Sequence, residues 1–143
     1  MDVEKVIAKF ELQGKPGKVE VISSGHINKS FKVINLQQGA PDYLLQSINT
    51  NIFRDVEALT SNIVKVTGHL RKKYSVSEAD RKVLTPISAR DGRYFYKDDE
   101  GTCWRMFIYI PDTKIVELAM SDKIAYEAGK AFGNFQSDLS DMP

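Results

Sequence analysis

Apolar residues recur along this chain with two spacings, every second residue in some segments and every third or fourth in others. Alternation is typical of strands, and the longer spacing is typical of helices. The first 50 residues predict a short helix capped by Asp2, followed by strands over residues 19–22, 30–35 and 43–48. Turns rich in glycine and proline separate these segments, which favours an antiparallel meander.

The most regular helical pattern follows Asp55, a good N-cap residue, and continues to about residue 74. Residues 75–82 predict a solvated connection, residues 83–87 an edge strand, and residues 93–110 a hairpin of two aromatic-rich strands. Ser121 begins a second helix with one apolar face. We therefore expect an α+β fold with a five-stranded antiparallel sheet and one long helix inserted after the third strand, followed by a final helix.

Composition narrows the class of protein only slightly. The 143 residues carry a net charge of +1, so no overall charge draws the chain to nucleic acid or to an anionic membrane. Cys103 is the single cysteine and cannot form an internal disulfide, which suits a reducing compartment. The first ten residues are charged throughout, unlike a signal peptide, and no apolar run is long enough to cross a bilayer. We expect a cytoplasmic protein.

Five stretches carry a resemblance to a known family: SGHINKSFKV, YLLQSINTNIF, LTSNIVKVTGHL, DEGTCWRMFIYI and AYEAGKAFGNFQSDL. In this order the chain resembles the N-terminal part of the aminoglycoside/choline kinase superfamily, and within it the N-acetylhexosamine 1-kinase-like branch. The resemblance implies a protein-kinase-like small lobe over residues 1–110, a hinge over 111–120, and the truncated start of a large lobe over 121–143.

The same resemblance implies an ATP-dependent phosphotransferase that uses Mg²⁺ and acts on a sugar-like small molecule. The catalytic base and metal ligands of such kinases lie in the large lobe. Residues 121–143 contain no His-x-Asp pattern. We therefore expect no catalytic or metal-binding residue in this chain, and we expect the chain alone to be inactive.

The resemblance assigns a phosphate-binding loop to Ser24, Gly25, His26, Ile27 and Asn28. A glycine-containing turn between two strands can direct backbone N–H groups at phosphate oxygens, and Gly25 permits close approach. His26 and Asn28 could meet phosphate or sugar hydroxyls. The same residues are also compatible with an ordinary hairpin turn whose asparagine bonds to backbone.

The third strand carries Gln46 where kinases place a lysine that holds the nucleotide phosphates. An amide can donate hydrogen bonds to phosphate but adds no charge. Another cation could supply that charge, with Lys29, Lys32 and Arg54 as candidates. On the long helix, Asn62 is the candidate partner of Gln46, and Glu57 is a second one. Alternatively, Gln46 is an ordinary strand residue with a satisfied amide.

Residues 105–112 correspond to the hinge strand and connector, against which adenine lies in kinases. Met106, Ile108, Ile110 and Val33 could form the apolar walls of such a pocket, but each could equally be plain core. Tyr109 lies in the same stretch and is a further candidate for nucleotide contact, although a packing role is also open. His69, on the long helix, is interpreted as solvated or structurally bonded.

A different class of function is also compatible with this sequence. A non-catalytic α+β binding or interaction domain could share the lobe topology, and the missing lysine and single-glycine loop favour that alternative. In either case the apolar face of the last helix, with Ile124, Phe132 and Phe135, predicts a surface for dimerisation.

Overall fold

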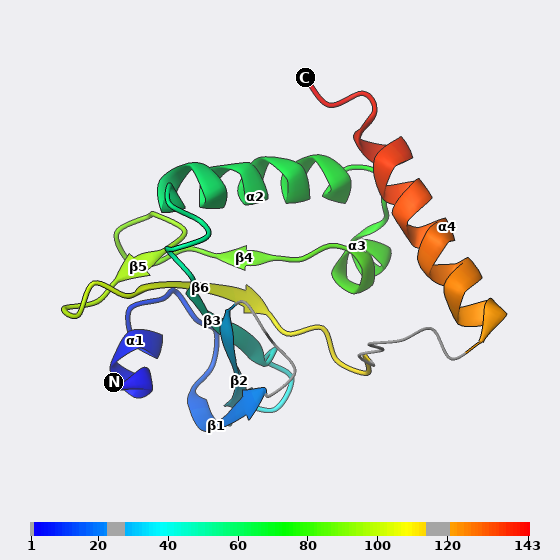
Figure 1. Cartoon of the computed structure of the whole chain (residues 1–143). Helices are drawn as coiled ribbons and strands as arrows, with labels where there is room; N and C mark the ends of the chain where they lie inside the picture. The colour runs from blue at the N-terminus through cyan, green and yellow to red at the C-terminus, as the bar shows by residue number, and fades with distance from the viewer. Residues whose placement is uncertain (1, 23–27, 114–120) are drawn as a thin grey trace.

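We describe a computed structural model of the chain, which covers residues 2–22, 28–113 and 121–143. It is a mixed α+β fold with one antiparallel sheet (Figure 1). The elements follow in the order α1 Val3–Ile7, β1 Pro16–Ile22, β2 Lys29–Asn35, β3 Tyr43–Ile48, α2 Val56–Arg71, α3 Val76–Lys82, β4 Pro86–Ile87, β5 Tyr96–Lys97, β6 Cys103–Ile108 and α4 Asp122–Leu139.

The sheet confirms the predicted α+β architecture but, over the described residues, has six strands instead of five, because the edge segment and both segments of the hairpin all join it, as β4, β5 and β6. Its order is β1-β2-β3-β6-β4, and β5 pairs with β6 beside this path. The first three strands form the predicted meander, and the chain then crosses over through α2 and α3. β6 returns between β3 and β4, in register with β3 through the pairs Gln46–Arg105 and Ile48–Cys103. Strand β6 is therefore central, although it comes last in the sequence.

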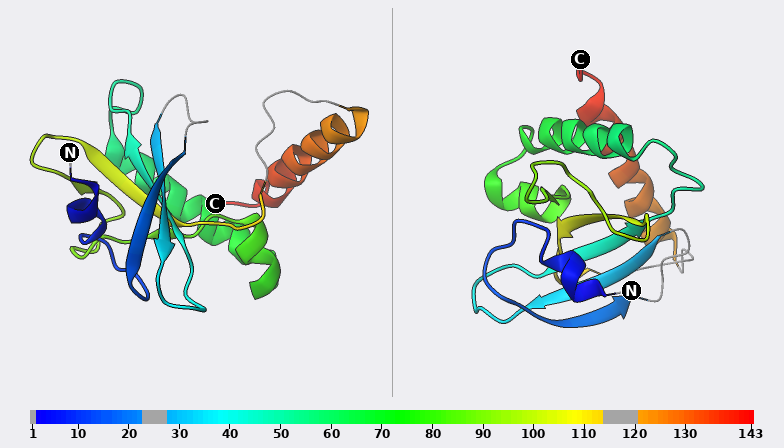
Figure 2. Two further views of the ribbon diagram at one scale, coloured as in Figure 1. Left: turned by 90° about the horizontal axis from the view of Figure 1, so that it is seen from below. Right: turned by 90° about the vertical axis from the view of Figure 1, so that its left-hand side faces the viewer.

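Two apolar cores lie on opposite faces of the sheet, because neighbouring side chains on a strand point in opposite directions. On the α1 face, Val33, Leu45, Trp104 and Met106 are almost completely buried and pack with Phe10. On the α2 face, a smaller core is formed by Ile48, Val56, Phe95 and Cys103. The two helical layers and the sheet between them are visible edge-on in Figure 2.

Local capping explains where three helices begin. Asp2, Asp55 and Ser121 each accept a hydrogen bond from the backbone N–H three residues later, as the sequence predicts. The prediction of a plain connection over residues 75–82 is wrong, because this segment forms α3. Ser75 caps α3 by accepting from the Glu78 N–H at 3.4 Å, and Ala79 is fully buried beneath it.

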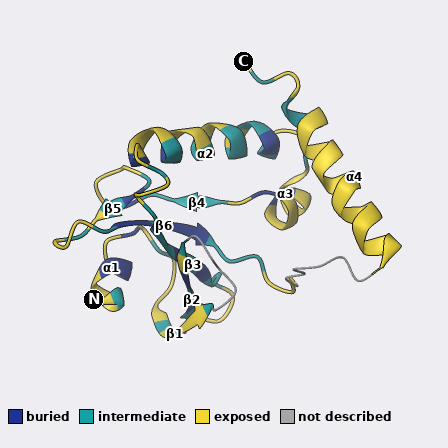
Figure 3. Cartoon of the chain, in the orientation of Figure 1, coloured by how far each residue is buried: buried dark blue, intermediate teal, exposed yellow. Residues whose placement is uncertain are grey.

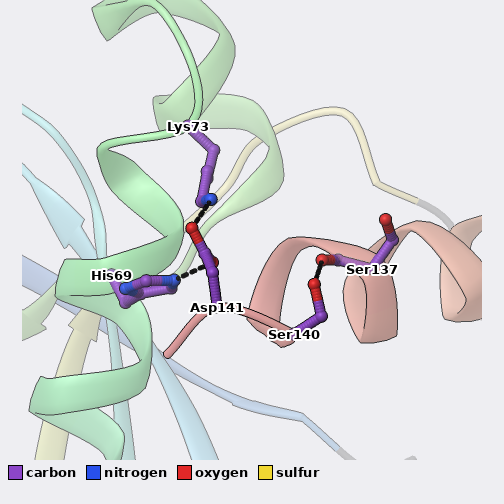
Figure 4. Close-up of polar contacts among 5 residues, drawn as sticks. All are labelled: His69, Lys73, Ser137, Ser140 and Asp141. Carbon is purple, nitrogen blue, oxygen red and sulfur yellow. Dashed lines mark hydrogen bonds and ion pairs between the residues drawn. The ribbon is translucent and has the colours of Figure 1, made fainter. Parts of the chain in front are cut away.

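Helix α4 lies apart from the sheet and is exposed along nearly its whole length (Figure 3). Its carboxyl end meets the end of α2 through a cluster of polar contacts, which we call the polar latch (Figure 4). Asp141 bonds to His69 at 2.8 Å and to Lys73 at 2.6 Å, and Asp138 accepts from the Tyr74 hydroxyl. The structural role predicted for His69 is confirmed by this contact.

Candidate functional site

The α2 face of the sheet is covered unevenly. Helix α2 packs over the end of β3 and the start of β6, where Ile48 and Cys103 are buried. Further along the face, Ser30 and Phe107 are buried, but several other side chains of β2, β3 and β6 are only partly buried. They comprise Lys32, Ile34, Leu44, Gln46 and Arg105. This partly open area, which we call the open sheet face, is the candidate site.

Three polar side chains on adjacent strands form a continuous chain of hydrogen bonds across the open sheet face. Gln46 Nε2 donates to Ser30 Oγ at 3.0 Å, and Arg105 Nε donates to Gln46 Oε1 at 3.0 Å. The strand register places the three residues side by side, since Ser30 pairs with Gln46 and Gln46 pairs with Arg105. Gln46 therefore has both ends of its amide engaged.

Arg105 brings a positive charge to this row from within the protein. Its guanidinium lies over the Phe107 ring, 5.3 Å from the ring centroid, and is partly buried between β6 and α2. Burial lowers the pKa of the Arg105 guanidinium, because the charged form loses hydration. Arginine remains protonated at neutral pH, so the row carries a fixed cation.

Lys32 provides a second cation on the same face. Its Nζ lies 4.4 Å from the centroid of the Tyr109 ring, a cation–π contact that joins β2 to the residue after β6. Glu20 is the acidic neighbour of Lys32 in the strand register, and it forms a surface ion pair with Lys18 at 3.6 Å. The open sheet face therefore combines two cations, one acid and the flat surface of a tyrosine.

A groove of about 620 Å³ lies where β6 ends. Ile108, Tyr109 and Ile110 line one side, and α3 and the β2–β3 turn line the other. Two backbone donors of this segment are already used within the protein: Ile108 N–H bonds to the Thr85 carbonyl at 3.0 Å and Tyr109 N–H to the Asp42 carbonyl at 2.9 Å. A ligand in this groove would have to use other groups of the segment.

The remaining predicted site residues fall in different places. Val33 and Met106 belong to the core on the α1 face, with 0% and 1% of their surfaces exposed, so the alternative of plain core holds for both. Asn62 is exposed on α2, and Gln46 bonds to Ser30 and Arg105 instead, so the predicted amide pair is wrong. Glu57 is likewise exposed.

The predicted phosphate loop lies largely outside the described residues, which exclude Ser24, Gly25, His26 and Ile27. Asn28 is described, at the entrance to β2. Its Oδ1 accepts from the Asn49 N–H at 2.9 Å, so this side chain ties the start of β2 to the end of β3. The interpretation as an ordinary turn expected Asn28 to bond to nearby backbone. Asn28 does bond to backbone, but to that of the neighbouring strand β3.

Sequence reasoning missed Arg105 as a site residue and named Lys29, Lys32 and Arg54 as the substitute cations. The alternation of β6 places residues 103, 105 and 107 on one face, and this signal was available. What the alternation could not show is that β6 lies next to β3, because that pairing depends on the crossover through α2.

Within the described ranges, no three His, Cys, Asp or Glu side chains lie close enough to hold a metal ion. Among the helices described, none is long and apolar enough to span a bilayer. Cys103 is buried, and desolvation raises the pKa of its thiol, so it is the inert strand residue that its position indicates.

The fold is that of a kinase-like N-terminal lobe. The chain is similar to an amicoumacin kinase solved in complex with AMP-PNP, Ca²⁺ and Ami, with a TM-score of 0.63 and 14% sequence identity. The similarity covers 99% of this chain and 40% of the kinase chain, so this chain spans less than half the length of that protein. No family model matches the sequence.

Proposed function

We propose that this chain is the nucleotide-binding lobe of an ATP-dependent small-molecule phosphotransferase. The observation that carries the proposal is the row Ser30–Gln46–Arg105 on the open sheet face of a kinase-like fold. Phosphate groups are bound by hydrogen-bond donors and cations, and a charged donor binds them about twice as strongly as a neutral one. Lys32 supplies the charge that a glutamine at position 46 lacks, and Arg105 donates a hydrogen bond to the Gln46 amide oxygen.

The open sheet face provides suitable chemistry for both ends of a nucleotide. Gln46 would donate to a phosphate oxygen, and the backbone N–H groups of residues 24–28 would be further phosphate donors, as the sequence resemblance implies. Tyr109, with Ile108 and Ile110, would form the apolar surface for the base beside the groove at the end of β6.

The metal and the catalytic base would come from elsewhere. Magnesium in kinases bridges the phosphates and is held by carboxylate and amide oxygens. The residues described here hold no acidic cluster of that kind. In a protein as long as the amicoumacin kinase, the large lobe would supply these groups together with the acceptor site. The present chain is expected to bind nucleotide weakly and to transfer no phosphate.

The acceptor is proposed on the sequence resemblance alone. An N-acetylhexosamine-type sugar is the acceptor that the resemblance implies, whereas the structurally similar kinase was solved with Ami. Because the acceptor would bind mainly outside this lobe, a sugar panel assayed on a chain that includes the large lobe, with ADP release as readout, is the appropriate test.

Nucleotide binding can be tested on the chain as it is. Thermal unfolding with and without millimolar ATP–Mg²⁺ should show stabilisation by about 1.4 kcal/mol if ATP is present at ten times its Kd. For a domain of this size that corresponds to a rise in Tm of a few degrees. The Gln46→Ala variant lacks the proposed phosphate donor, so ATP should raise its Tm by less. Equal melting temperatures with and without ATP would favour a non-catalytic binding domain.

We also propose that two copies of the chain associate through α4. Ile124, Phe132 and Phe135 are 37%, 63% and 43% exposed, and together they form an apolar surface on one helix. Exposed apolar surface of this kind is typical of interaction sites. In a longer protein, a large lobe would compete for the same surface, so the proposal concerns this chain in solution.

A further inference from the structure

The third strand of a kinase lobe carries the side chain that binds phosphate, and the partner of that side chain in this chain differs from the partner in protein kinases. In those enzymes a glutamate on the long helix forms an ion pair with the strand lysine, so helix position controls the site. In this chain the position carries Gln46, and the polar residues of α2 considered for the pairing, Asn62 and Glu57, are both exposed. The hydrogen bond to Gln46 Oε1 comes from Arg105 on the neighbouring strand.

We propose that Arg105 is a positioning residue that fixes the Gln46 amide for phosphate binding, a role that a helix glutamate fills for the strand lysine in protein kinases. This inference rests on the proposed function and deepens it. Arg105 carries no acceptor, so it can bond only to the oxygen end of the amide. The nitrogen end of Gln46 is thereby directed to Ser30 and to the open sheet face.

The geometry of the row makes the arrangement rigid. Gln46 and Arg105 are register partners on two central strands, which cannot move relative to each other without breaking the ladder between β3 and β6. The Phe107 ring supports the guanidinium from one side. An amide nitrogen has two hydrogens, and Ser30 Oγ accepts one of them. The second is the hydrogen that we assign to a phosphate oxygen.

The test separates phosphate contacts from base contacts by comparing affinities for ATP and adenosine, measured by calorimetry on the full chain. Wild type should bind ATP more tightly than adenosine. Arg105→Met should reduce this ATP preference about tenfold, and Gln46→Ala should reduce it similarly. The double variant should lose no more than Gln46→Ala alone, because a positioning residue acts only through its partner. Asn62→Ala and Glu57→Ala should leave the preference unchanged.

Each other outcome has a defined meaning. If wild type binds neither ligand, the proposed function fails. If ATP binds but Arg105→Met keeps the full preference, the positioning role is wrong. Additive losses in the double variant would overturn it too, since Arg105 would then contact phosphate directly. Should Arg105→Met not fold, Arg105→Gln decides: it removes the charge but keeps N–H donors for Gln46 Oε1, so a retained ATP preference would support the positioning role and a tenfold loss would contradict it.

Discussion

The sheet lobe and helix α4 are built on opposite principles. In the sheet lobe, two cores enclose both faces, and Phe10, Leu45 and Trp104 are completely buried. No residue of helix α4 is buried, and its connection to α2 consists mainly of the polar latch. The difference shows where precision is available: side chains on the sheet are positioned by packing and register, whereas those on α4 depend on a few exposed polar contacts.

The largest difference between the two regions should appear when a large aromatic side chain is removed from each. Trp104→Ala should lower the free energy of unfolding by about 3–5 kcal/mol, because it leaves a cavity beside Phe31 in the larger core. Phe132→Ala on α4 is the matched control and should change it by less than about 0.5 kcal/mol. Urea unfolding followed by circular dichroism measures both, and equal losses would contradict the comparison.

Removing a polar contact inside the sheet lobe should lower the free energy of unfolding by less than the loss of a core aromatic, but still by a measurable amount. Asp98 accepts from Trp104 Nε1 at 3.0 Å and from the Glu100 and Thr102 N–H groups, and it thereby orders the turn between β5 and β6. Asp98→Ala should lower the free energy of unfolding by about 1–3 kcal/mol, the usual range when N–H donors lose a charged acceptor. Asp99→Ala, an exposed neighbour in the same turn, should cost far less in the same urea assay.

The pH dependence of the Asp98 contribution follows from the direction of its pKa shift. Chiefly the hydrogen bond from Trp104 lowers the pKa of the Asp98 carboxyl in the folded chain. A group with a lowered folded pKa stabilises the protein above its unfolded value, about 3.9, and loses that contribution as pH falls through the folded pKa. The stability difference between wild type and Asp98→Asn should therefore shrink below about pH 4. A difference that grew on acidification would contradict this assignment.

The polar latch should affect the position of α4 more than the stability of the chain. Hydrogen bonds from Lys73 and then His69 lower the pKa of Asp141 to about 2. The ion pairs of Asp141 should consequently be intact above about pH 4, and they should be lost as the pH falls toward the Asp141 pKa of about 2. Asp141→Ala should increase amide exchange in the last turns of α4 with little change in the urea midpoint. Asp122→Ala, at the other end of α4, should leave exchange in those turns unchanged.

The smallest effect on stability is expected on the apolar face of α4, where the readout is association. Phe132→Ser combined with Phe135→Ser should leave the unfolding midpoint within error while shifting the chain from dimer to monomer in light scattering at high concentration. Lys130→Ser serves as the control and should not shift it. A wild-type chain that stays monomeric would contradict the dimerisation proposal.

The sequence predicted the individual helices and strands better than it predicted which elements pack beside one another. Tyr43–Ile48 and the helix capped by Asp55 follow directly from alternation and capping, because these signals act within a few residues. Helix α3 also had a local signal, Ser75 followed three residues later by Glu78, which is the pattern of a capping box. Its short length and high polarity masked that signal.

The candidate site depended on information that no local pattern contains. The choice between core and pocket for Met106 required knowing which sheet face α1 covers, and the role of Arg105 required knowing that β6 inserts beside β3. The position of β6 beside β3 results from the crossover of the chain through α2 and α3, which no local pattern reveals. Gln46 was recognised as unusual from the sequence, but its two partners, Ser30 and Arg105, come from different strands and only the fold brings them together.

The most direct measurement of the central claim is a titration of the isotope-labelled chain with ATP, followed by two-dimensional NMR. If the open sheet face binds the nucleotide, resonances of Lys32, Gln46, Arg105 and Tyr109 should shift with one common Kd. The α1 face, represented by the Trp104 indole N–H, should remain unchanged. Shifts confined to the α1 face or to α4, or no shifts at millimolar ATP, would contradict the account.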